Sequence, residues 1–435
     1  MDYLYYCMNK KIRCAIVGIG GHGETHLQYI GKAEDAGLCT LNAAVVRPAD
    51  NLDHIIKQWR LIERGVVIFN SFNDLILEGS DLFDLVILPV GIGFHAEYSC
   101  KAMRAGKHVL CEKPPAATIQ EVDSMSQWSE ASGKVCAIGF PQMSSDLIIE
   151  AKLKVCEGII GEVKKISNFG IWKRDKQYFS RNGWAGKITS QGRWILDGTI
   201  NNPFAHQIMA SLFLASAEQG RSARPREVTA ELYHGNDIES EDTSCIRIKT
   251  DSGATIFGAA TQCGPKDHYP EIEIVGTKGT IGIVIGKYAK IRVNNSVETI
   301  HARNDERTNM YANIFNAING VHPIQCPVSI TKNFTLTVNG AFESSAFVNN
   351  IPAEYRAMHS PYGSAVPEEA FTAVHDIESI ISRAFKERLL FSEAGVAWAR
   401  PSQKFMINDD YSFFRFHAHD KATVRKKQYK GVVYA

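Results

Sequence analysis

The sequence predicts two domains of mixed α and β structure: a doubly wound parallel sheet over residues 11–140, and an α+β domain with a large open, mostly antiparallel sheet over residues 141–400. Three observations support this. The 435 residues exceed what one hydrophobic core usually organises. Short apolar runs alternate with helical patterns up to about residue 140, which is typical of a parallel sheet covered on both faces. Longer runs of alternating polarity then follow, separated by glycine-containing turns.

The first domain is expected to alternate strands with helices, the last helix opening with a capping box between Thr118 and Glu121. The expected strands cover residues 13–18, 41–46, 66–69, 85–88, 108–111 and 135–139. The expected helices cover residues 24–34, 53–64, 95–105 and 118–132.

The second domain opens with an expected helix at residues 146–157 and continues as a sheet. Its expected strands cover residues 163–172, 228–233, 244–250, 254–261, 271–275, 280–285 and 290–293. Helices are expected to return at residues 309–318, 331–348 and 367–386. The polar and aromatic extension at residues 401–435 is left unassigned.

The composition excludes several classes of protein. A formal net charge of +1 provides no electrostatic footprint for nucleic acid or a membrane surface. No apolar run approaches the roughly 20 residues that span a bilayer, and the N-terminal residues do not have the pattern of a signal peptide. The ten cysteines contain no CxxC pair and no metal-ligand spacing. We therefore expect a cytoplasmic protein with reduced thiols and no metal site.

A glycine-rich turn follows the first predicted strand. Gly18-Ile19-Gly20-Gly21-His22-Gly23 fits the pattern GxGxxG and opens a predicted helix. In this context the first glycine permits the tight turn, the second lets a diphosphate approach the backbone, and the third allows close packing of helix and strand. A purely structural turn is the alternative, but the strand and helix around the motif favour a Rossmann site for NAD or NADP.

The end of the second predicted strand bears on the choice between these cofactors. An acidic residue at this place usually binds the ribose hydroxyls, whereas this chain has Arg47 there and Asp50 three residues later. Because arginine pairs well with phosphate, Arg47 modestly favours NADP. The alternative is that Arg47 is solvated and that Asp50 binds the ribose.

The segment Asp84–Pro114 resembles the Gfo/Idh/MocA family of sugar and cyclitol oxidoreductases, through His95, the run AGKHVLC at residues 105–111, and Glu112-Lys113-Pro114. Similarity continues at VGTKGTI (275–281) and LLFSEAGVAWAR (389–400). The resemblance implies that Lys113 lies near the nicotinamide and holds the reacting hydroxyl. The expected cofactor-binding residues are Gly18, Gly20, Gly21, His22, Gly23, Arg47, Pro89, Val90, His95, Glu112 and Lys113.

A histidine from the second domain is the acid or base that the resemblance implies, and His206 matches its place. Four or five residues are inserted after Asp197, and Met209 stands where the family usually has a second aspartate. We expect Lys113, His206 and Asp197 to be catalytic, with Asp197 or Asn202 replacing the missing carboxylate. A histidine that merely packs on a helix face is the alternative.

An aromatic and polar cluster precedes this segment, between residues 172 and 187. Aromatic faces stack on sugar rings, while arginine, asparagine and tyrosine bind hydroxyls or a carboxylate. A loop anchored to the core by its tryptophans is the alternative. The expected substrate-binding residues are Tyr178, Arg181, Asn182, Trp184 and Asn202.

Three functions remain open. The first is an NAD(P)-dependent dehydrogenase or reductase acting on a carbinol or ketone of a sugar, sugar acid or cyclitol. The second is a redox-neutral epimerase or glycosidase-like enzyme with tightly bound cofactor, which would not consume added cofactor. The third is a catalytically silent NAD(P)-binding sensor, suggested by Met209 but disfavoured by the retention of Lys113 and His206. Burial of the open sheet predicts a homodimer or homotetramer.

Overall fold

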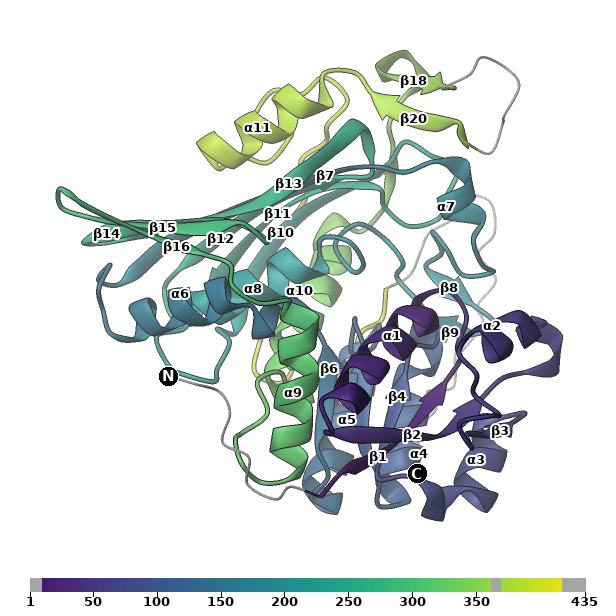
Figure 1. Cartoon of the computed structure of the whole chain (residues 1–435). Coiled ribbons are helices and arrows are strands. Elements are labelled where there is room, and N and C mark those ends of the chain that lie inside the picture. The colour runs from purple at the N-terminus through teal and green to yellow at the C-terminus, as the bar shows by residue number, and fades with distance from the viewer. Residues whose placement is uncertain (1–9, 361–368, 417–435) are drawn as a thin grey trace.

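The computed structural model describes residues 10–360 and 369–416. Its N-terminal domain contains a six-stranded sheet in the order β3-β2-β1-β4-β5-β6, and every adjacent pair is parallel (Figure 1). This confirms the doubly wound sheet, whose strand order reverses beside β1. The strands are β1 (Ile12–Val17), β2 (Cys39–Val45), β3 (Val67–Phe69), β4 (Leu85–Leu88), β5 (His108–Glu112) and β6 (Cys136–Gly139).

Four of the five helices of this domain lie close to their predicted places, whereas the helix at residues 72–78 was not predicted. The capping box between Thr118 and Glu121 is present at the start of α5. The second helix ends at Gln58 rather than residue 64, and Arg60 has a left-handed φ of 50°, which a continuing helix could not include. The helices are α1 (His22–Asp35), α2 (Asp53–Gln58), α3 (Phe72–Glu78), α4 (His95–Arg104) and α5 (Ile119–Ser132).

The second domain is built on a ten-stranded sheet with the main order β16-β15-β14-β13-β7-β12-β11-β10-β17. The sheet is mixed but mostly antiparallel: β7 pairs in parallel with β12, and β10 with β17. Its strands are β7 (Val163–Lys173), β10 (Pro225–His234), β11 (Thr243–Thr250), β12 (Thr255–Thr261), β13 (Cys263–Gly276), β14 (Gly279–Val284), β15 (Tyr288–Val293), β16 (Ser296–His301), β17 (Asn349–Asn350) and β21 (Phe405–Met406), which pairs with β10.

Helices fill the space between this sheet and the first domain. Three of them, α6 (Asp146–Cys156), α8 (Ala205–Ala215) and α10 (Val328–Ser345), lie beneath the sheet (Figure 1). Helix α9 (Glu306–Ile318) instead runs beside α1, where the rings of Tyr29 and Tyr311 stack with centroids 6.2 Å apart. The second domain therefore contributes a helix to the cofactor-binding half of the molecule.

The opposite face of the large sheet is covered in part by this chain itself. Helix α11 (Ile377–Glu387) buries Ile377 and Ile381 against it. The prediction of one helix over residues 367–386 is wrong at its start, because β20 (Phe371–Val374) precedes α11 and pairs with β18 (Arg356–His359). Residues 367–368 lie outside the described part. Self-coverage weakens the expectation that a second subunit must cover this whole face, and the predicted oligomer stays a prediction.

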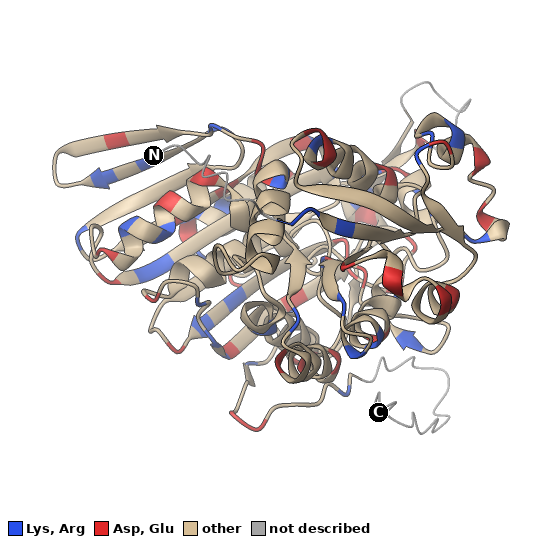
Figure 2. Ribbon diagram, turned by 60° about the horizontal axis from the view of Figure 1, so that its bottom comes forward, with Lys and Arg blue, Asp and Glu red and all other residues tan. Residues whose placement is uncertain are grey.

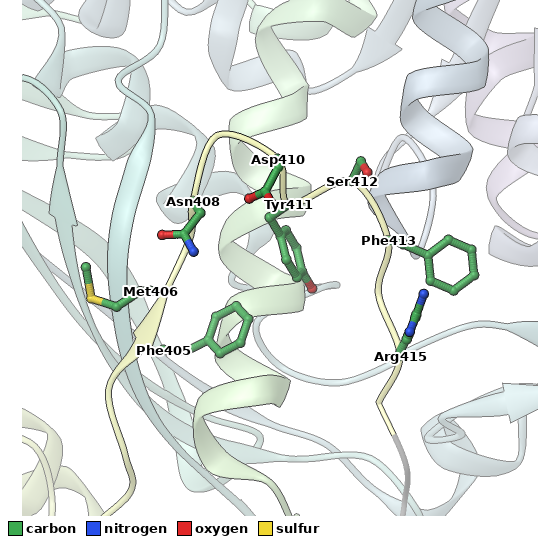
Figure 3. A pocket seen from close by; sticks show the side chains of 8 residues that line it. All are labelled: Phe405, Met406, Asn408, Asp410, Tyr411, Ser412, Phe413 and Arg415. Atoms are coloured by element: carbon green, nitrogen blue, oxygen red, sulfur yellow. The ribbon is translucent and has the colours of Figure 1, made fainter.

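The described part of the C-terminal extension ties the two domains together. Phe414 is buried; its amide and carbonyl bond the Gln120 side chain on α5, and its ring meets Trp194 with centroids 5.1 Å apart. A pocket of about 400 Å³ lies within this segment, lined by residues between Phe405 and Arg415. Figure 3 shows the side chains that line it. None of the predicted site residues lines it. Residues 417–435 of the extension lie outside the described part.

The charged residues and the cysteines are distributed as follows. Acidic and basic residues alternate over the ribbon instead of gathering in one patch (Figure 2). The nine cysteines in the described ranges are free thiols, and eight of them are buried. Among the helices of the described residues, none combines the length and apolarity that crossing a bilayer requires.

Candidate active site

The glycine-rich turn has the geometry that its sequence predicts. Gly18 has a φ of 90°, which favours glycine. A Cβ on Gly23 would lie 2.3 Å from the Gly18 carbonyl oxygen, so a side chain there would force α1 away from β1. Helix α1 begins at His22, at the end of this turn, and in Rossmann domains the diphosphate binds at the N-terminus of the helix in this place.

The predicted discriminator between NAD and NADP is already paired. Arg47 donates two hydrogen bonds to the Asp50 carboxylate, at 3.0 and 2.7 Å. The Arg47 side chain is 73% exposed. The carboxylate cancels the charge that was expected to attract a 2′-phosphate, so the structure adds no support to the predicted NADP preference.

Glu112 is the centre of a buried polar cluster at the end of β5. His26 lies 2.9 Å from its carboxylate and His22 lies 3.3 Å from it. The other ring nitrogen of His26 contacts the Tyr311 hydroxyl on α9 at 2.7 Å. Although burial opposes ionisation, the bonds to His22 and His26 hold the pKa of Glu112 well below its usual range.

This cluster has the residue types of a metal site but also an internal cation. Ligand atoms of His22, His26 and Glu112 lie within 4.8 Å of one another. Arg307 Nη1 lies 3.7 Å from the same Glu112 oxygen and 3.3 Å from His22 Nε2. A metal ion here would meet the guanidinium at close range, so a hydrogen-bonded ion cluster fits these residues better.

His95 is the first residue of α4. Its ring is buried and lies 2.7 Å from the Pro114 carbonyl oxygen and 3.0 Å from that of Val90. Both ring nitrogens are therefore engaged by backbone. Through these contacts His95 joins the turn that follows β4, with Pro89 and Val90, to the segment that carries Lys113. These contacts give His95 a positioning role, and its expected contact with the cofactor stays a prediction.

A chain of hydrogen bonds joins Lys113 to the second domain. The Lys113 ammonium donates to the side-chain oxygen of Asn202 at 2.6 Å and to its carbonyl at 3.1 Å. The Asn202 amide donates to Asp197 at 2.7 Å. Burial lowers the pKa of Lys113 to about 8, so the ammonium is charged at neutral pH. The predicted insertion after Asp197 thus places a neutral amide directly against the predicted catalytic lysine.

The other side of Asp197 holds the aromatic cluster. Arg181 donates to Asp197 at 3.2 Å, and its guanidinium lies over the Tyr178 ring at 4.0 Å. Trp184 reaches the first domain, since a Cβ on Gly91 would lie 3.0 Å from its indole nitrogen. Asn182 differs: its side chain accepts the Trp184 amide and shapes the local turn. Tyr178, Arg181 and Trp184 are thus gathered beside Asp197.

His206 lies in the first turn of α8, close enough to Lys113 for the two to interact electrostatically. Its Nδ1 is buried and has no hydrogen-bond partner. Its ring meets Phe140 edge-on with centroids 5.7 Å apart. Burial, and then the Lys113 ammonium, lower the pKa of His206 to about 3, so the imidazole is neutral at physiological pH.

The expected orientation of this imidazole by Asp197 is not observed. The Asp197 carboxylate is occupied by Asn202, Arg181 and the backbone amide of Gly186. Met209 is fully buried in the core, so no polar group replaces the missing family carboxylate at that position. Asp197 instead positions Asn202, and through it Lys113.

Two residues of this region carried no usable signal in the sequence. The buried carboxyl of Glu241 accepts the Ile200 amide at 2.8 Å and lies beneath Gly198, where a Cβ would be 1.8 Å from a carboxyl oxygen. Arg307 approaches the glycine-rich turn from α9. Both lie far along the chain from their partners, so spacing could not find them.

Known proteins share both halves of this architecture. Residues 12–140 match the model of the oxidoreductase family with an NAD-binding Rossmann fold (GFO_IDH_MocA), and residues 148–282 match the GFO/IDH/MocA C-terminal domain. The scyllo-inositol 2-dehydrogenase (NAD(+)) of Bacillus subtilis is 25% identical over 63% of this chain and 75% of its own length. The alpha-N-acetylgalactosaminidase of Shewanella oneidensis is 29% identical over 66% of this chain and 65% of its own.

Solved structures share the fold at lower identity. The WlbA dehydrogenase of Bordetella pertussis, in complex with NADH and UDP-GlcNAcA, superimposes with a TM-score of 0.64 at 21% identity, covering 77% of this chain and 97% of that one. The two family models together match more than half of the sequence. The chain therefore belongs to the Gfo/Idh/MocA family of NAD-dependent oxidoreductases.

Proposed function

We propose that this protein transfers a hydride between a nicotinamide and a carbinol or ketone of a sugar, sugar acid or cyclitol. One arrangement carries the proposal: the half-buried ammonium of Lys113, held by Asn202 of the second domain, and the neutral imidazole of His206 lie within electrostatic range of each other at the junction of the two domains. Oxidation of a carbinol needs both groups, one to stabilise the developing alkoxide and one to accept its proton.

The residues divide this work as follows. Lys113 donates a hydrogen bond to the reacting hydroxyl oxygen, and Asn202 holds the ammonium ready for it. His206 accepts the hydroxyl proton, because its ring is neutral at physiological pH. Bound NAD supplies the hydride acceptor, and in the reverse direction the donor. Phe140 packs against the imidazole and restricts water beside it.

The polar cluster around Asp197 supplies the substrate side of the site. Arg181 and Lys113 place two cations near a single carboxylate. The rings of Tyr178 and Trp184 provide apolar faces for a sugar or cyclitol ring. The WlbA neighbour is bound to a nucleotide sugar acid, and the Bacillus relative is named for an inositol. These two classes bracket the substrates to test first.

A redox-neutral reaction is the second candidate, favoured by similarity to an alpha-N-acetylgalactosaminidase over two thirds of this chain. There the hydride would be removed and then returned, with no net use of cofactor. A silent sensor is disfavoured, because the Lys113–Asn202–Asp197 chain is intact.

A screen of sugars, sugar acids and cyclitols with NAD and with NADP tests the proposal, with absorbance of the reduced nicotinamide as the readout. Net reduction of NAD by one substrate class is the expected result. Release of a sugar from an α-glycoside without net absorbance change would instead establish the redox-neutral reaction. Absence of both reactions, with NADH binding intact, would favour the sensor.

Assembly is a separate proposal. The part of the large sheet that α11 leaves uncovered is expected to lie against a second copy, giving a homodimer or homotetramer. Light scattering at micromolar concentration checks this, and a monomer would reject it.

A further inference from the structure

Arg307 approaches the glycine-rich turn from a distant part of the chain. It is the second residue of α9, which follows the large sheet and runs beside α1 (Figure 1). Its Nη1 lies 3.3 Å from Nε2 of His22, the first residue of α1. The guanidinium also lies 5.6 Å from the centre of the Tyr29 ring on α1. Arg307 and His22 are thus neighbours at the glycine-rich turn although more than 280 residues separate them in the sequence.

The start of α9 is fixed there by several contacts. Asp305 caps the helix by accepting the Arg307 amide at 3.0 Å. The same carboxylate accepts the Tyr29 hydroxyl at 2.6 Å and lies 3.4 Å from the Lys32 ammonium, and both partners belong to α1. The backbone of Arg307 is therefore held against α1 by the start of its own helix.

The donors of Arg307 exceed its present partners. A guanidinium carries five N–H groups in a planar fork. Among the described residues its ionic contact is the long one of 3.7 Å to Glu112, whose carboxylate already has His26 at 2.9 Å. The side chain remains 21% exposed beside the turn. Donors thus remain for an anion placed at the first amides of α1.

We propose that Arg307 binds the diphosphate of the dinucleotide, as a cofactor contact contributed by the second domain. The inference rests on the proposed nicotinamide function. The helix amides supply only partial positive charge, whereas the two phosphates carry a full negative charge each, which a planar guanidinium pairs with in two-point fashion. Glu112, the carboxylate that faces the guanidinium, is only a long contact at 3.7 Å and has His26 as its nearer partner at 2.9 Å.

Calorimetry with Arg307→Met tests the proposal, using NADH and ADP-ribose as probes. Loss of one charge-assisted contact should weaken both ligands by about 10- to 100-fold. Equal losses for the two place the contact on the shared diphosphate, not on the nicotinamide. Adenosine, measured by competition against NADH, lacks phosphates and should bind as it does to the wild type.

Arg303→Met is the matched control. Arg303 also carries a guanidinium near the start of α9, but it faces Asp146 and Glu150 on α6. Its removal should leave both affinities within twofold. Arg307→Lys keeps the charge, loses the fork, and should give an intermediate loss; it also serves if Arg307→Met proves poorly folded.

The outcomes separate the two levels of inference. Unchanged NADH affinity in folded Arg307→Met or Arg307→Lys overturns the role of Arg307 while leaving the proposed function standing. A loss confined to NADH, with ADP-ribose unaffected, would move the contact to the nicotinamide and also overturn it. Failure of the wild type to bind either probe would instead reject the nicotinamide function itself.

Discussion

The cofactor side and the substrate side of this site are assembled in different ways. The cofactor turn is six consecutive residues, and its geometry follows from the strand before it and the helix after it. The substrate side is a relay between Lys113, Asn202 and Asp197, which come from both domains. The spacing of a local motif is enough to predict its function. The relay exists only when the two domains are packed together, so the sequence alone does not reveal it. Perturbing each side should therefore produce different losses.

The largest expected effect on turnover comes from Lys113, the residue of the first domain in the relay. Lys113→Met should lower turnover by about 100- to 10,000-fold, because no ammonium remains to stabilise the alkoxide. NADH affinity should change little, which would show that the two sides are separable. Steady-state kinetics on the identified substrate and calorimetry with NADH measure the two quantities.

The wild-type pH profile provides an independent check on Lys113. Burial lowers its pKa to about 8, so the charged form is lost as the pH rises through 8. The kcat/KM of the wild type should fall above that pH. Lys164→Met, on an exposed lysine of β7, is the control and should leave the profile unchanged. A profile flat to pH 10 would remove Lys113 from the reaction.

His206→Ala should also lower turnover strongly, by about 100-fold or more, since the proton acceptor is lost. The double variant with Lys113→Met should be much less than multiplicatively worse, because groups that act on one hydroxyl act as a unit. Near-normal turnover in His206→Ala would shift the role of base to Tyr178. Gln207→Ala, the adjacent helix residue, tests for general damage to α8.

The same contrast explains how far the sequence could be interpreted. Strands β1 to β6 and the glycine-rich turn were predicted because their signals are local. Phe371–Val374 was predicted as helix because its strand partner, Arg356–His359, lies more than ten residues earlier in the chain. The local sequence pattern therefore does not reveal the pairing. The expected support of His206 by Asp197 is not observed, and three donors that the spacing does not reveal bond that carboxylate instead.

Glu241 is a residue of the substrate side that bonds the backbone of the turn before α8. Burial raises the pKa of its carboxyl to about 8, and the neutral acid holds the turn at residues 198–202. Its stabilising contribution is complete below pH 4.5 and is lost as the pH rises through 8. Glu241→Gln should remove this dependence, an effect on the order of a few kcal/mol.

Thermal unfolding between pH 5 and 8.5 measures this difference. The wild type should lose stability relative to Glu241→Gln as the pH increases. Glu239→Gln, the same change at an exposed carboxylate two residues earlier, should follow the wild type. Parallel curves for the wild type and Glu241→Gln would mean that the carboxyl is already ionised in the folded protein.

The smallest expected effect lies on the cofactor side, where Asp50 neutralises Arg47. Asp50→Ala should release the guanidinium toward a 2′-phosphate and raise the affinity for NADP relative to NAD. The pair is largely exposed, so solvent screening limits the change to about threefold to tenfold. Asp53→Ala removes the same charge from the first turn of α2 and should leave the ratio unchanged.

The affinity of Asp50→Ala for NAD distinguishes two roles of Asp50. This affinity falls if Asp50 binds the ribose hydroxyls, and it is retained if Asp50 acts only by pairing with Arg47. An unchanged ratio in Asp50→Ala would mean that this end of β2 does not select the cofactor, and the local motif would then specify dinucleotide binding without specifying which dinucleotide.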